Sequence, residues 1–95
     1  FTLDRSAVIV QANLAGTTLL GLTRERPASG RLAMFVSETD RQTFSTCIDQ
    51  AFASREAQTC EVSLWRETGT PRRVQISALS VEDGRICRVV VVDVS

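Results

Sequence analysis

The end of the chain restricts the fold more than any other stretch. Residues 88–95 read RVVVVDVS, so four valines, from Val89 to Val92, follow one another with no polar residue between them. A strand that has one face in water alternates apolar and polar side chains, and this run does not. The fold must therefore provide a cover for both faces of this strand.

Length and composition predict one small globular domain. The 95 residues are 43% hydrophobic and 23% charged, and the net charge is zero, so nothing favours nucleic acid or an anionic membrane as a partner. The longest apolar run is too short to cross a bilayer and there is no signal peptide, so we expect no membrane insertion and a cytoplasmic location. The chain begins at Phe1 rather than at methionine, which predicts that residues 1–95 were cut from a longer protein.

The three cysteines, Cys47, Cys60 and Cys87, are odd in number and widely spaced. This pattern argues against a disulfide framework, and also against a zinc site, which needs close pairs of ligands. We expect three free thiols in a reducing cytosol and no metal site. All 11 basic residues are arginine, which is typical of a GC-rich bacterial genome.

The first third of the chain predicts a hairpin followed by a short helix. Residues 1–4 and 7–12 have the composition of two strands, and Arg5 and Ser6 form the tight turn between them. Asn13 is a suitable N-cap, because its side-chain oxygen can accept a hydrogen bond from a free backbone N–H group. The helix should end at Gly21, which tolerates the left-handed conformation after a helix.

A broken segment and a long helix follow. Pro27 and Gly30 exclude a long helix before residue 36, so we expect single turns there. Thr39 and Gln42 match a capping box at the start of the long helix. Apolar residues then recur with helical spacing on one face. The single turns should be anchored by Leu32, Met34 and Phe35, and the helical stripe consists of Phe44, Cys47, Ile48, Ala51 and Phe52.

The last part of the chain predicts three strands, over residues 59–66, 74–79 and 86–94, with a turn at Glu82–Gly84 before the last one. A connection at residues 69–71 would pair Leu64 with Ile76 and Val62 with Ala78. This register places the apolar side chains of both strands on the same face.

Five segments in this order resemble the PAS domain, a sensor module of signalling proteins. They are LDRSAVIVQAN, NLAGTTLLGLTRER, SGRLAMFVSETDRQTF, EVSLWRETGTPRRVQISA and the closing DVS, and together they cover essentially the whole chain. Ser37 stands where proline is common in the family and Thr68 where the turn aspartate is common. Ser6 replaces a glycine, which suggests a less strained first turn.

The resemblance implies an α+β fold. It has a five-stranded antiparallel sheet of order 2-1-5-4-3, with short helices and one longer helix on one face. The last strand then lies in the middle of the sheet, so the helices cover one side of the valine run and the other side faces outward. In PAS proteins a flanking helix or a partner subunit covers that outer face. The resemblance therefore implies a homodimer, and our candidates for its contact surface are Trp65, Leu79, Val90 and Val92.

The closing residues Asp93 and Ser95 resemble the exit of the family, where a linker leads to a signalling or output domain in the same chain. A carboxylate in an apolar strand costs stability unless it is paired. We therefore expect Asp93 to accept hydrogen bonds from backbone N–H groups or from an arginine.

A candidate ligand pocket follows from the apolar stripes. Side chains from the helical side should face side chains from two strands, and the residues are Phe35, Phe44, Cys47, Ile48, Ala51, Val62, Leu64, Val74, Ile76 and Ala78. One interpretation is a site for a small apolar molecule. The alternative is a core filled by its own side chains, without a ligand.

No enzyme site is recognisable. The chain has no histidine, which excludes Ser-His-Asp and Cys-His arrangements, and it has no glycine-rich nucleotide-binding motif. Haem-binding relatives mostly use a histidine on the long helix, and because this chain has none, only the Cys47 thiol could serve as an iron ligand. The light-sensing flavin members carry a cysteine before the long helix that the segment GRLAMFVS lacks. We therefore predict no cofactor, with non-covalent flavin and haem both disfavoured.

The predicted function is a non-catalytic sensory and dimerisation module of a bacterial signal-transduction protein, such as a sensor kinase, a cyclic-dinucleotide enzyme or a transcription regulator. The first alternative is a structural protein–protein interaction domain that binds no ligand. A small α+β enzyme is the remaining alternative, and the missing histidine argues against it.

Overall fold

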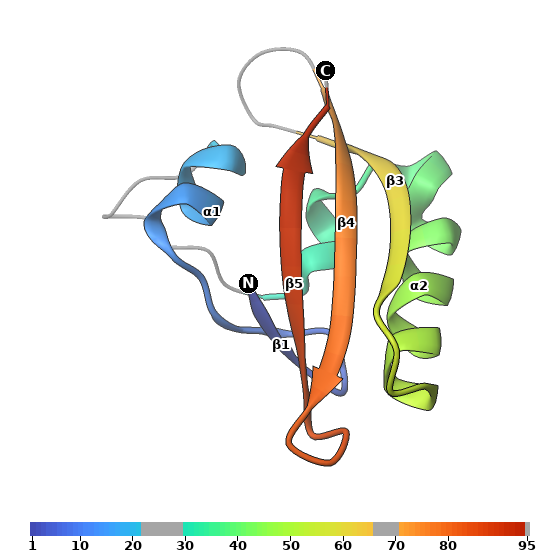
Figure 1. Ribbon diagram of the computed structural model, residues 1–95. Helices are drawn as coiled ribbons and strands as arrows, with labels where there is room; N and C mark the ends of the chain where they lie inside the picture. Colours follow the sequence, from blue (N-terminus) through green and yellow to red (C-terminus); the bar gives the residue numbers. More distant parts are fainter. Residues whose placement is uncertain (22–29, 66–70, 95) are drawn as a thin grey trace.

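The computed structural model describes residues 1–21, 30–65 and 71–94, and shows one sheet with helices on one side of it (Figure 1). The five strands are antiparallel and lie in the order β2-β1-β5-β4-β3, which confirms the predicted α+β fold and strand order. The elements are β1 (Thr2–Asp4), β2 (Ile9–Gln11), α1 (Leu14–Leu19), the 3₁₀ helices η1 (Leu32–Phe35) and η2 (Glu38–Asp40), α2 (Arg41–Ala53), β3 (Gln58–Leu64), β4 (Arg72–Val81) and β5 (Ile86–Asp93).

The central strand β5 divides its valines between the two faces of the sheet. Cys87 and Val89 are buried beneath the helices, and Val91 is half-buried on the same side. Val90 and Val92 alternate with them and are 62% and 50% exposed on the opposite, outer face. Because side chains alternate along a strand, an unbroken valine run supplies both the core and an exposed apolar surface.

The hairpin and short helix at the N-terminus form as predicted. The Asn13 side chain caps α1 by accepting a hydrogen bond from the Gly16 N–H (2.8 Å), and Gly21 follows the helix with φ 78°. The first turn differs from expectation, because Ala7 adopts φ 62°, a left-handed conformation that is uncommon for residues other than glycine. The Asp4 carboxylate holds this turn by accepting from the N–H groups of Ser6 and Val8.

Two predictions about the helical side are wrong. Asp40, and not Thr39, directly precedes α2, and no side chain caps the helix there, so the capping box does not form. The Asp40 carboxylate instead accepts a hydrogen bond from the Ser63 N–H of β3 (2.8 Å). Met34 does not anchor η1, since it is 65% exposed, whereas Leu32 is buried and fulfils that role.

The predicted register of β3 and β4 is also wrong. Val62 pairs with Val74 and Leu64 pairs with Arg72, so each partner lies four residues earlier in β4 than predicted. The connection therefore runs from residue 65 to residue 71, and its part at residues 66–70 lies outside the described residues. A shift of four is even, so the apolar faces of both strands still coincide and Val62, Leu64 and Val74 are all buried.

Candidate functional site

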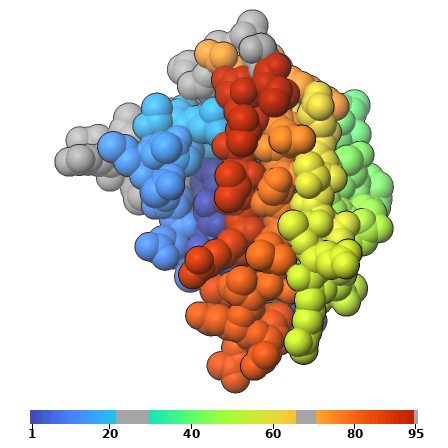
Figure 2. Space-filling model, viewed as in Figure 1, coloured from blue at the N-terminus to red at the C-terminus, as the bar shows by residue number. Residues whose placement is uncertain are grey.

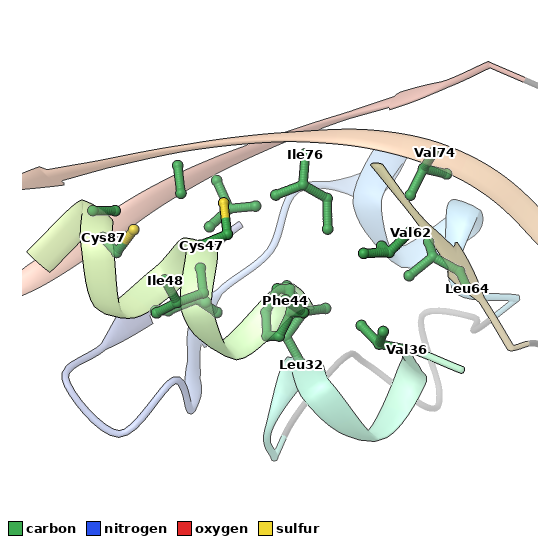
Figure 3. Packing of buried hydrophobic residues seen from close by; sticks show 14 of the residues in the cluster. Leu32, Val36, Phe44, Cys47, Ile48, Val62, Leu64, Val74, Ile76 and Cys87 are labelled. Carbon is green, nitrogen blue, oxygen red and sulfur yellow. The ribbon is translucent and has the colours of Figure 1, made fainter. Parts of the chain in front are cut away.

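The predicted pocket residues form a continuous apolar layer between α2 and the sheet (Figure 3). Each of them is at most 4% exposed except Phe35, which is half-buried at the edge of this layer. Phe44 comes from α2 and lies across from Val62 and Ile76 of the strands, as the close-up shows. Helical spacing on α2 and strand alternation on β3 and β4 therefore bring together residues that are far apart in sequence.

This interior offers a ligand apolar contact and almost nothing polar. Among the described residues, Thr17 is the only buried polar side chain, and it belongs to α1. No group of three or more histidine, cysteine, aspartate or glutamate side chains in the described part of the chain could hold a metal ion. A molecule bound between α2 and the sheet would thus be recognised by its shape and apolar surface.

A surface groove of about 440 Å³ lies elsewhere, between α1 and the middle of β5. Phe1, Gly16 and Leu19 line it on one side, and Val89 to Val91 line it on the other. None of the ten predicted pocket residues contributes to this groove.

The outer face of the sheet exposes several apolar side chains among polar ones. Figure 2 shows β5, β4 and β3 at the front of the molecule, with no helix in front of them. Val90 (62%), Val92 (50%) and Leu79 (38%) are exposed there, and Trp65 (54%) is exposed just after the end of β3. Sequence reasoning missed Val10, which is 61% exposed on β2 and points outward because its neighbour Ile9 is buried.

The end of β5 is held by two bonds to β4. The Asp93 carboxylate accepts a hydrogen bond from the Arg72 guanidinium (3.2 Å), which is the arginine partner that we expected. The Arg73 carbonyl accepts a hydrogen bond from the Val94 N–H (3.0 Å). Asp93 is not buried, however, since 36% of its side chain is exposed, so burial does not explain its pairing. Ser95 lies outside the described residues.

A polar network that the sequence did not indicate joins α2 to the sheet. The Arg73 guanidinium donates to the carboxylates of Asp40 (3.0 Å) and Glu61 (3.1 Å), while Asp40 also accepts from the Ser63 N–H. Arg73 therefore links the start of α2 to β3, and its carbonyl group holds Val94. The strand pairing that brings these residues together was mispredicted, so the network could not be found from the sequence.

Comparisons with known proteins agree with this architecture. The PAS domain of an HTR-like protein from Haloarcula marismortui, known from a crystal structure, has the same fold, with a TM-score of 0.77 at 19% sequence identity. The match covers 98% of this chain and 78% of that chain. No curated protein sequence matches significantly, and no helix in the described ranges is long and apolar enough to span a membrane. The family model described as "PAS domain" matches residues 1–95, and the chain therefore belongs to the PAS domain family.

Proposed function

We propose that this PAS domain is a non-catalytic sensory and dimerisation module of a bacterial signal-transduction protein in the cytoplasm, and that it is followed by an output domain in the same chain. Membership of the family supports a sensory or interaction role in signalling. The single observation that carries the more specific proposal is the exposure of Val90 and Val92 of β5, with Leu79 of β4, on the outer face of the sheet.

The partner in this proposal is a second copy of the chain. Val90 and Val92 of β5 and Leu79 of β4 are exposed on neighbouring strands, where their cross-strand partners are Ser77, Gln75 and Arg88, and Trp65 is exposed just after the end of β3. A small domain gains stability when such apolar side chains leave water, because burial of apolar area contributes roughly 25 cal/mol per Å². Arg88 lies on the same face beside them, so polar contacts can border the apolar centre.

Analytical ultracentrifugation tests this proposal. We expect the wild-type chain to dimerise with increasing concentration and Val90→Glu to remain monomeric, because the substitution places a charge in the centre of the contact. Thr43→Glu on the exposed side of α2 is the matched control and should dimerise like the wild type. The proposed dimer would be contradicted by a wild-type chain that stays monomeric at every concentration, or by a Val90→Glu variant that dimerises normally.

The signal in this proposal is a small, apolar and non-covalent ligand between α2 and the sheet. The support is the apolar layer formed by α2, β3 and β4. Native mass spectrometry of the purified chain should then show a bound molecule that denaturing conditions release.

A second candidate function is an interaction domain without a ligand, and the near-zero exposure of the same layer favours it. If native spectra from several growth conditions contain only the mass of the chain itself, the second candidate is supported and the ligand is refuted. The dimer is tested independently of this result.

The route by which the signal leaves the domain is the end of β5, at Asp93 and Ser95. The bonds from Arg72 to Asp93 and from Val94 to the Arg73 carbonyl support a defined direction for the chain at this point. Small displacements of the sheet would then move the segment that follows.

A further inference from the structure

Two of the three thiols meet at the boundary between α2 and β3. Cys47 belongs to the buried stripe of α2 and is 4% exposed. Cys60 lies two residues before Val62 on β3, so its side chain points to the same face, toward α2, and it is half-buried. Both cysteines line one surface hollow of about 350 Å³, together with Thr46, Gln50 and Thr59.

The two thiols interact with each other. Burial raises the pKa of Cys60, and the adjacent Cys47 thiol raises it further, to about 12. The partly buried position of Cys60 removes water that would stabilise its thiolate. A negative charge on Cys60 is also disfavoured by the neighbouring Cys47 side chain. Near neutral pH the Cys60 thiol is therefore uncharged, so Cys60 places no negative charge beside the sulfur atom of Cys47.

We propose that Cys47 and Cys60 form a redox modification site, in which hydrogen peroxide converts the two thiols into a disulfide that joins α2 to β3. The hollow opens to the surface, so the peroxide reaches Cys60 first. The Cys60 thiolate attacks one peroxide oxygen, the O–O bond breaks, and after proton transfer Cys60 carries a sulfenic acid and water leaves. The Cys47 sulfur then attacks the Cys60 sulfur, and the hydroxyl group departs as a second water. Two thiols are thus oxidised and one peroxide is reduced to two waters.

The raised pKa makes this site slow to react and stable once it has reacted. A thiolate is the reactive form of cysteine, so a thiol that rarely ionises reacts slowly with a peroxide. Disulfides that are easily reduced are those whose reduced form is stabilised as a thiolate. Cys60 lacks that stabilisation, so its disulfide resists reduction. The site would record sustained oxidation rather than a brief exposure.

The third cysteine, Cys87, serves as an internal control for this proposal. Cys87 is fully buried on β5 and does not line the hollow. Burial raises the pKa of the Cys87 thiol, and Cys47 adds to this rise. A disulfide between Cys47 and Cys60 therefore leaves Cys87 free. The proposal does not depend on dimerisation or on a ligand in the apolar layer.

Hydrogen peroxide treatment of the whole 95-residue chain tests the site, with thiol titration and peptide mapping by mass spectrometry after denaturation. We expect the wild type and Cys87→Ala to lose two thiols each and to yield one peptide that links Cys47 to Cys60. Cys60→Ser and Cys47→Ala should form no intramolecular disulfide. The reaction rate should rise about tenfold per pH unit between pH 7 and pH 8, following the thiolate fraction. The oxidised chain should also unfold at a higher temperature than the reduced chain, because the cross-link restricts the unfolded state.

Circular dichroism shows whether each variant is folded. If Cys47→Ala does not fold, Cys60→Ser provides the test, because Cys60 is only half-buried. The proposal is overturned if Cys60 accumulates as sulfinic acid without a cross-link, if Cys87 takes part in the disulfide, or if all three thiols survive prolonged treatment at pH 8. Disulfides only between separate chains would overturn it as well.

Discussion

The contact of Asp40 with β3 yields a quantitative prediction about stability. Replacement of Asp40 by alanine removes the acceptor of the Ser63 N–H at 2.8 Å and the partner of Arg73 at 3.0 Å. The Asp40 side chain is only 21% exposed, so water replaces these contacts incompletely. We therefore expect this variant to lose more stability than any variant of an exposed charge in the same network.

The magnitude follows from the two bonds. A hydrogen bond to a charged group contributes about 1.5 to 3 kcal/mol, and the unpaired Ser63 N–H adds to the loss. The ion pair with Arg73 adds little, on the order of 0.5 kcal/mol, because such partly exposed pairs are weak. The expected loss for Asp40→Ala is about 2 kcal/mol, which corresponds to a melting temperature roughly 10 °C lower for a domain of this size.

Urea unfolding followed by circular dichroism measures this loss, with Glu61→Ala as the matched control. Glu61 binds the same Arg73 guanidinium, but its side chain is 55% exposed, so we expect almost no change. Asp40→Asn keeps an oxygen that can accept from Ser63 and should lie between the wild type and Asp40→Ala. If Asp40→Ala and Glu61→Ala have equal unfolding midpoints, the bond to Ser63 does not stabilise the fold and the reasoning is refuted.

Three further predictions concern single side chains. Asn13→Ala should lower the free energy of unfolding by about 1 kcal/mol in urea titrations, and Asn13→Ser should restore most of it, because serine also caps a helix. Burial raises the pKa of Cys60 from 9.0 to about 12, so the thiol loses its proton at a lower pH in the unfolded chain than in the folded chain. The free energy of unfolding should therefore fall as the pH rises from 9 toward 12, and Cys60→Ser should make that decline shallower. Asp93→Ala breaks an exposed ion pair and should leave the domain folded by circular dichroism, yet alter stimulus-dependent output in the parent protein. Unchanged regulation would show that Asp93 only ends a strand.

Local patterns in the sequence predicted the elements that depend on local physics. Helical spacing correctly predicted the buried stripe of α2 at Phe44, Cys47, Ile48 and Ala51, whereas Phe52, at the end of the predicted stripe, is only partly buried. The faces of β3 and β4 were correct for a similar reason, since alternation fixes the parity of a strand. The strand order came from a family resemblance and not from these patterns.

The errors concern features that depend on contacts between residues far apart in the sequence. The register of β3 and β4 depends on the connection from residue 65 to residue 71, and alternation cannot distinguish pairings that differ by an even number. Thr39 matched a capping box, but Asp40 bonds to Ser63 across the fold, and a sequence pattern contains no information about that tertiary contact. The Arg73 network was missed because it depends on the same register.

The position of β1 has a consequence for the order of folding. Strands β3, β4 and β5 are consecutive in the chain, whereas β1 reaches β5 through bonds between Phe1 and Val89, which are 88 residues apart. Closing so long a loop is entropically costly, so the three-stranded meander should assemble first and the N-terminal hairpin should dock last. The same hairpin should then be the first part to detach in the native state. Each detachment bares the backbone of β5 at Cys87 and Val89, so the N-terminal hairpin is what protects this domain from strand exchange and aggregation at its central strand.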